Sequence, residues 1–161
     1  GGVVPAYHIE LFLHVIAVII VFGITFAYPF LQGAAERAGT GQTKFALGLI
    51  HRLETYVVTP GAVVVLILGG ILIGNDKLPY KDDMPAWLMI AVVWFLAAFA
   101  VGFFVQRRNV KQALAVLEPV SDSAPLPAAY EPIGKRMQIV GGLLGFSVIA
   151  IAFLMVYKPG Q

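Results

Sequence analysis

Four apolar runs, each of about 18 to 25 residues, constrain this chain more than any other feature of its sequence. A helix of that length is needed to cross the hydrocarbon of a bilayer, whereas a soluble core does not require it. Composition agrees, because 59% of the residues are hydrophobic and only 12% are charged. We therefore expect an all-α integral membrane protein, a four-helix transmembrane bundle with spans at 7–32, 44–74, 87–106 and 137–157.

The spans and their connections nearly fill the 161 residues, so residues 1–161 are expected to form a single membrane domain. The first run has no basic segment before it and is too long for a cleaved signal, so we interpret it as a span. A short Gly-rich turn is predicted at 33–41. The longest connection, 107–136, begins with 107–117, which is either a helical extension or an amphipathic segment on the membrane surface.

The basic residues predict the orientation, because cytoplasmic loops are enriched in Lys and Arg. The first and third connections hold seven of them, and the opposite side holds three. Both termini are therefore expected outside and the 107–136 loop in the cytoplasm. Topology also explains the net charge of +2, so we expect no nucleic acid partner. The seven are Arg37, Lys44, Arg107, Arg108, Lys111, Lys135 and Arg136, and the three are Lys77, Lys81 and Lys158.

Polar side chains in the first span fall on one side of the helix. At about 100° per residue they lie within about 60° of one another, and Ala17 and Val21 share their sector. Because hydrocarbon offers no hydrogen bonds, we expect this polar stripe to face other helices or a wet cavity. The stripe consists of Glu10, His14, Thr25, Tyr28 and Gln32.

His14 is the leading candidate for chemistry. It follows Glu10 by one helical turn, and a neighbouring carboxylate can orient an imidazole and make it a better ligand. One interpretation is a haem or metal ligand, or a step of a proton path. The other is a buried histidine that is hydrogen-bonded across the bundle. Candidate cofactor-binding residues are His14, Glu10 and Tyr28, with His14 as the candidate metal ligand.

The polar stripe needs hydrogen-bond partners wherever it is buried. Depth in the membrane makes three residues of other spans candidates to pair with Tyr28 and Gln32, at the cytoplasmic end of the first span. Glu10 and His14, near the outer surface, are left without an expected protein partner. The three candidates are Thr55 and Thr59 of the second span and Gln138 of the fourth.

A second group of polar residues, His51, Arg52 and Glu54, begins the second span. An axial gap of about 16 Å along the helices separates His51 from His14, too far for both to bind one metal or haem. We interpret the group as an interfacial cluster that positions the helix entrance or binds a lipid headgroup. In the fourth span, Gly141 and Gly145 have the spacing that favours close helix packing.

Several short motifs resemble a bacterial membrane family of unknown function, and the resemblance covers all four spans. That family is similar to HemJ-type protoporphyrinogen oxidases and to the membrane domain of copper-resistance protein D. His14 and Pro60 match the HemJ frame, whereas the third span lacks the lysine and histidine found there. The motifs are Leu13-His14-Val15-Ile16-Ala17, Tyr28-Pro29, Arg52-Leu53-Glu54, Thr59-Pro60-Gly61 and Met155-Val156-Tyr157-Lys158-Pro159.

The resemblance implies a multi-pass protein of the bacterial inner or plasma membrane. We expect a small non-catalytic subunit or scaffold, which serves a haem or redox partner through His14. The alternative is a HemJ-like haem-dependent oxidoreductase. The expected cofactor is haem b, and the expected partners are the lipid bilayer and either further copies of the chain or other subunits of a membrane complex.

Overall fold

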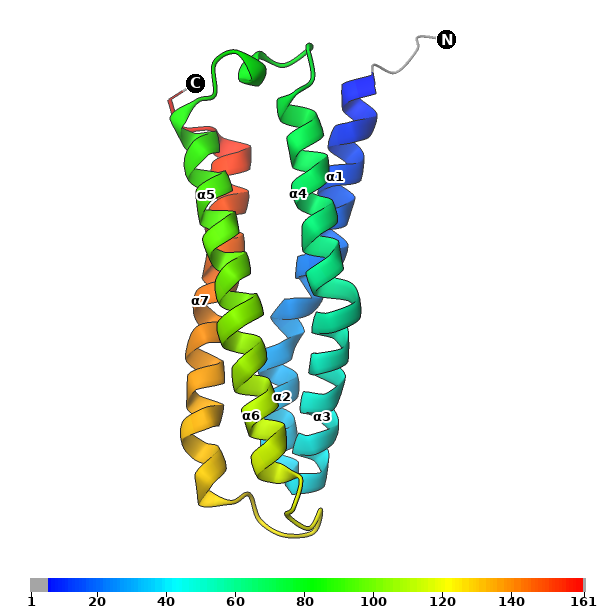
Figure 1. The fold of residues 1–161 in the computed structure, drawn as a ribbon, viewed down its shortest axis with the longest axis vertical. Helices are drawn as coiled ribbons and strands as arrows, with labels where there is room; N and C mark the ends of the chain where they lie inside the picture. Colours follow the sequence, from blue (N-terminus) through cyan, green and yellow to red (C-terminus); the bar gives the residue numbers. More distant parts are fainter. Residues whose placement is uncertain (1–5, 161) are drawn as a thin grey trace.

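The computed structural model describes residues 6–160, which form helices and connections without any strand. Four helical rods run the length of the molecule (Figure 1). All four are long and apolar enough to cross a bilayer, which confirms the expected four-helix transmembrane bundle. These first to fourth spans are Ala6–Ala38, Thr40–Ile73, Ala86–Leu117 and Ala128–Tyr157.

The first span consists of two α-helices joined by a tighter turn. Helix α1 (Ala6–Gly23) leads through a 3₁₀ turn (Ile24–Ala27) into α2 (Tyr28–Ala38). Pro29 explains the break, because it has no N–H to donate to the carbonyl of Thr25, four residues earlier. That carbonyl instead accepts the backbone N–H of Tyr28, at the spacing of a 3₁₀ turn.

The second span contains a wider turn. Helix α3 (Thr40–Leu53) passes through a π-helical segment (Glu54–Val58) into α4 (Thr59–Ile73). Pro60 cannot donate to the carbonyl of Tyr56, and its ring crowds that carbonyl. The helical turn before the proline can therefore widen, and the π-helical segment Glu54–Val58 lies in this part of the span.

The third span is also irregular, whereas the fourth is regular. Helix α5 (Ala86–Ala100) continues through a π-helical segment (Val101–Gln106) into α6 (Arg107–Leu117). Of the two interpretations of 107–117, the helical extension is therefore confirmed. The fourth span opens with a 3₁₀ turn (Ala128–Tyr130) and continues as α7 (Glu131–Tyr157).

The first and third connections are shorter than the sequence suggested. The turn predicted at 33–41 is wrong, because helix continues to Ala38 and resumes at Thr40. Gly39 alone reverses the chain, with a φ of 132° that favours glycine. Because α6, the 3₁₀ turn at 128–130 and the start of α7 occupy most of the predicted 107–136 loop, only 118–127 remains irregular. At the other end, the connection 74–85 contains a 3₁₀ turn, Pro79–Lys81.

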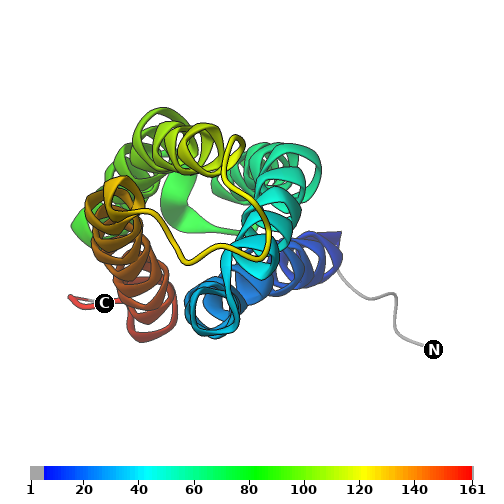
Figure 2. The ribbon, with the colours of Figure 1, turned by 90° about the horizontal axis from the view of Figure 1, so that it is seen from below.

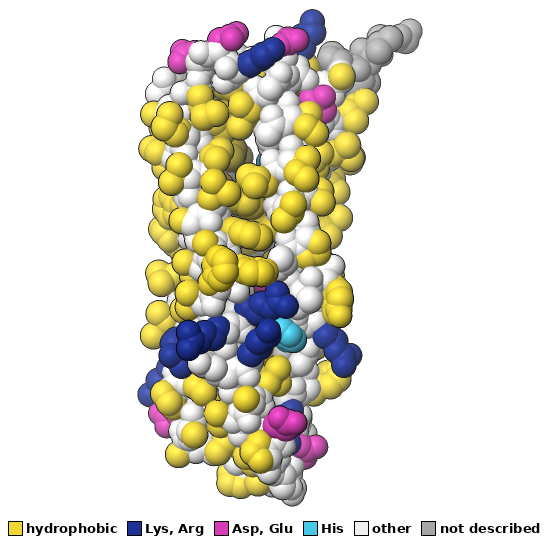
Figure 3. All heavy atoms as spheres, viewed as in Figure 1, with side chains coloured by type: hydrophobic (Ala, Val, Ile, Leu, Met, Phe, Trp, Pro, Cys, Tyr) yellow, Lys and Arg dark blue, Asp and Glu magenta, His cyan; other side chains and the backbone are white. Residues whose placement is uncertain are grey.

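The spans are longer than a bilayer is thick. The second span has 34 residues, and a helix of that length extends about 50 Å against about 30 Å of hydrocarbon. A band of Lys and Arg side chains crosses the molecule between its apolar surface and the end that carries 118–127 (Figure 3). Since basic side chains gather at a membrane boundary, we place the surplus length at this loop end. The opposite end, where the first span begins and the fourth finishes, is the terminal end.

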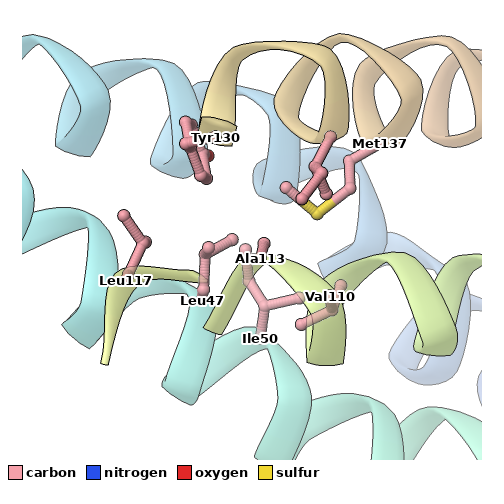
Figure 4. Packing of buried hydrophobic residues seen from close by; sticks show 8 residues of the cluster. Leu47, Ile50, Val110, Ala113, Leu117, Tyr130 and Met137 are labelled. Carbon is pink, nitrogen blue, oxygen red and sulfur yellow. The ribbon is translucent and has the colours of Figure 1, made fainter. Parts of the chain in front are cut away.

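Apolar side chains are packed most tightly at the loop end, outside the part of the bundle that is expected to lie in the hydrocarbon of the membrane. Side chains of α3, α6 and the start of the fourth span meet there (Figure 4). Ala113 and Leu117 are fully buried, and Leu47 and Met137 are nearly so. This end core consists of Leu47, Ile50, Val110, Ala113, Leu117, Tyr130, Ile133 and Met137.

The membrane part of the bundle is packed as two helix pairs. Helix α1 lies against α4, and α5 lies against α7, while consecutive spans are neighbours around the bundle (Figure 2). A small buried cluster joins Val21, Val58 and Val65. Many large apolar side chains, including Ile20 and Phe146, are exposed, as a surface in contact with lipid should be.

Both ends of the described chain lie at the terminal end (Figure 1), so cysteine labelling can test which side of the membrane it occupies. The chain has no native cysteine, and Ser123 and Asp83 are exposed at opposite ends. In intact cells, we expect a membrane-impermeant thiol reagent to label Asp83→Cys and to spare Ser123→Cys until the membrane is permeabilised. The reverse pattern would invert the orientation that the basic residues predict.

Candidate functional site

The polar stripe of the first span faces the protein, as predicted. Val21 and Gln32 are buried, and the other members of that sector are at least half-buried. Side chains on the opposite side of the same span, including Phe12 and Phe30, are exposed. The helical period therefore correctly identified which side of the first span is shielded from lipid.

Glu10 has a protein partner that the sequence did not suggest. The side-chain amide of Asn75, in the connection after α4, donates a hydrogen bond of 2.6 Å to the Glu10 carboxylate. The expectation that Glu10 lacks a partner is therefore wrong. The pairing of Glu10 with His14 suggested by their spacing is not among the hydrogen bonds of the described chain.

The Nδ1 atom of His14 has no hydrogen-bond partner within residues 6–160, although the backbone of Val65 on α4 lies close to the ring. This nitrogen is buried, and the ring packs against α4 at Gly69. A β-carbon at position 69 would lie only 3.2 Å from Cε1 of the imidazole, so the glycine makes room for the ring. A buried polar atom without a partner is costly at membrane depth, and such a group is a candidate for ligand binding.

The other predicted cofactor residue, Tyr28, is not close to His14. Fourteen residues separate them on the first span, which corresponds to about 21 Å along its axis. Within residues 6–160, no three His, Cys, Asp or Glu side chains are grouped as metal ligands. His14 thus offers a single imidazole there, which suits a haem, whose macrocycle supplies four ligands of its own, better than a bare metal ion.

A second polar site, the polar cavity, lies near the loop end. Its volume is about 40 Å³, and it is enclosed between the first three spans and Met137 of the fourth. Residues at the irregular segments within the first, second and third spans contribute to it. Tyr28 follows the 3₁₀ turn, Glu54 begins one π segment, and Arg107 follows the other. The remaining polar side chains of its lining are Gln32, His51 and Gln106.

Two of these groups have a buried polar atom without a direct partner. The Tyr28 hydroxyl and Arg107 Nε are buried, and neither has a hydrogen-bond partner within residues 6–160. The charge of Glu54 acts on both. A water molecule needs about 10–15 Å³ of such volume, so water fits the polar cavity and can bridge these groups, whereas an organic cofactor cannot enter it. The two glutamines bond elsewhere: Gln106 donates to the Met137 carbonyl at 2.9 Å and Gln32 to Glu36 at 2.7 Å.

The partners predicted for Tyr28 and Gln32 are wrong. The Thr55 hydroxyl bonds to the His51 carbonyl within its own span, at 2.8 Å. No hydrogen bond of Thr59 to the stripe is found among the described residues, and Gln138 is exposed. Glu54 is the residue that acts on Tyr28 instead, and Arg107 lines the same cavity. In the sequence, Glu54 and Arg107 are each a charged residue at the end of an apolar span. That position alone does not show whether the side chain points into the bundle or out of it.

The structure divides the predicted interfacial cluster. His51 and Glu54, three residues apart, both line the polar cavity, whereas Arg52 between them is exposed on another face of α3. The predicted packing glycines have ordinary surroundings. A β-carbon at Gly141 would lie 3.5 Å from Gln106, and one at Gly145 would lie 3.7 Å from Phe26.

Comparison with known proteins gives a family. The model of one family, described as "Predicted integral membrane protein (DUF2269)", matches residues 9–159, and the chain belongs to this family. No curated protein and no solved structure matches the chain. The family description states a membrane location and gives no activity.

Proposed function

We propose that this integral membrane protein of the DUF2269 family is a non-catalytic subunit that holds haem b through His14 and serves a redox partner. The observation that supports the proposal is the buried Nδ1 of His14, which has no hydrogen-bond partner within residues 6–160. Glu10, the other polar group near it on the stripe, is already bonded to Asn75. Of these two neighbouring polar groups on the stripe, the imidazole is the one with a polar atom still available.

The surroundings of His14 suit a haem-ligating imidazole. Gly69 leaves room for the ring, and apart from Glu10 the neighbouring residues of α1 and α4 are apolar. A bound haem would supply one-electron chemistry, and His14 would hold the iron. The resemblance to HemJ-type proteins, which places a histidine at the same point, supports this assignment. We expect the redox partner to be another subunit of a membrane complex or a second copy of the chain.

An absorption spectrum tests the proposal. We expect the protein purified in mild detergent, after expression with added haem precursor, to show a Soret band. His14→Leu should lose that band, since it removes the iron ligand and keeps an apolar side chain in place. His8→Leu is the matched control, because His8 is exposed on the same helix and should retain the spectrum.

Two results would refute haem binding through His14. One is a wild-type protein that has no Soret band even after incubation with haem. The other is a His14→Leu variant whose spectrum equals that of His8→Leu.

A further inference from the structure

Three side chains of α3 and α6 converge where these helices meet. His51 and Arg107 line the same polar cavity, one from each helix. Lys111 follows Arg107 by one helical turn and so shares its side of α6. The charges of Arg107 and Lys111 both act on His51, which places the three groups in one electrostatic environment. We call them the basic seam.

The basic seam lacks a compensating anion at its surface. Ion pairs in the described part of the chain involve Lys44, Lys81 and Lys135, and none involves the seam. Glu54 faces Arg107 from inside the polar cavity and is the acidic group whose charge acts on it there. Arg107 nevertheless keeps a buried Nε without a hydrogen-bond partner within residues 6–160. The carboxylate of Glu54 is thus the acidic group that balances the charges of Arg107 and Lys111 beside the His51 imidazole.

The position of the basic seam suggests the kind of anion it would take. In Figure 3, a patch of Lys, Arg and His side chains lies directly at the edge of the apolar surface. On the hydrocarbon side of the seam, Tyr56 of the second span is 77% exposed and Phe104 of the third is 69% exposed. An anion bound here would therefore lie beside an apolar surface able to receive acyl chains.

We propose that the basic seam binds the phosphate of an anionic phospholipid headgroup. Arg107 and Lys111 supply charge-assisted hydrogen bonds to the phosphate oxygens, and His51 adds a further donor. The acyl chains lie along the apolar surface that includes Tyr56 and Phe104. A headgroup seated there ties α3 to α6 on the outside of the bundle, beside the polar cavity.

The competing explanation is that basic residues at a membrane boundary attract anionic lipid without forming a site. Arg52 and Arg108 allow the two to be separated. Each is exposed, each directly follows a member of the basic seam in the sequence, and neither lines the polar cavity. The double variant Arg52→Gln/Arg108→Gln removes as much charge, at the same depth, as Arg107→Gln/Lys111→Gln does.

Thermal unfolding in detergent provides the test, with delipidated protein titrated separately with phosphatidylglycerol, phosphatidylcholine and inorganic phosphate. We expect phosphatidylglycerol to raise the midpoint more than phosphatidylcholine does, and phosphate to leave it unchanged. Since each hydrogen bond to a charged group contributes about 1.5–3 kcal/mol, Arg107→Gln/Lys111→Gln should weaken the apparent affinity for phosphatidylglycerol by about 100-fold or more. Arg52→Gln/Arg108→Gln should bind like the wild type.

A second pair of variants covers the case in which loss of Arg107 prevents folding. Lys111 is exposed, so Lys111→Gln should fold, and it should weaken phosphatidylglycerol binding more than Arg108→Gln does. Equal losses in the seam variants and their controls would show diffuse attraction and refute the site. The same midpoint shift with inorganic phosphate, or with phosphatidylcholine, would refute the assignment to an anionic lipid.

Discussion

Replacing Leu117 by alanine is expected to destabilise the protein by about 2–5 kcal/mol, as removal of a fully buried leucine does in other cores. Leu117 has no exposed surface and lies in the end core, which we place outside the hydrocarbon. Unfolding therefore exposes the Leu117 side chain to water, and lipid cannot fill the cavity that the alanine substitution leaves. Thermal unfolding in detergent, followed by circular dichroism, should show a clearly lower midpoint.

Leu143→Ala is the matched control for this prediction. Leu143 is 62% exposed on α7, in the part of the bundle that meets lipid. In both leucine and alanine variants the apolar side chain faces lipid or detergent, so truncation should leave the midpoint of unfolding nearly unchanged. If the two variants unfolded alike, the end core would not be the main source of stability in this bundle.

The second large effect is expected at Gly61. A β-carbon there would overlap the side chain of Val21, because α1 and α4 approach closely at this point. Gly61→Ala must displace one helix or force Val21 from its conformation, at a cost of about 1–3 kcal/mol. The same substitution raises helix propensity by up to about 1 kcal/mol, so the steric effect should prevail. Unfolding by a denaturing detergent should require a lower detergent fraction.

Gly70 provides the comparison within the same helix. No atom lies within 4 Å of the position its β-carbon would take, so Gly70→Ala gains propensity without a clash. It should be neutral or slightly stabilising. A Gly61→Ala variant as stable as Gly70→Ala would mean that α1 and α4 are not in such close contact.

The architecture and the lipid-shielded side of the first span could be predicted because both depend on hydrophobic period alone. A bilayer requires long apolar helices, and it requires polar groups such as those of Glu10 and His14 to face inward. Neither conclusion needs knowledge of which span contacts which. This is why the four spans and the polar stripe were correctly identified.

Hydrogen-bond partners could not be predicted in the same way. Asn75 reaches Glu10 from a connection whose path hydropathy does not describe, and Arg107 lines one cavity with Tyr28 and Glu54. Helical period also does not distinguish α from π geometry, so the backbone that orients Glu54 and Arg107 was missed. The close approach at Gly61 depends on the placement of Val21 on a different helix, which no spacing within the second span reveals.

The composition of the end core has a consequence for biosynthesis. Leu47 and Ile50 come from α3, and the other six members lie beyond residue 106. When the first two spans have left the ribosome, the side chains of Leu47 and Ile50 are exposed beyond the membrane surface, because their partners in the end core have not yet been made. The contact between Gly61 and Val21 can already form in lipid at that stage. The nascent helical hairpin must wait for the fourth span before its exposed end is protected. A chaperone or protease that samples unfinished chains would therefore encounter this protein as an inserted but still open bundle.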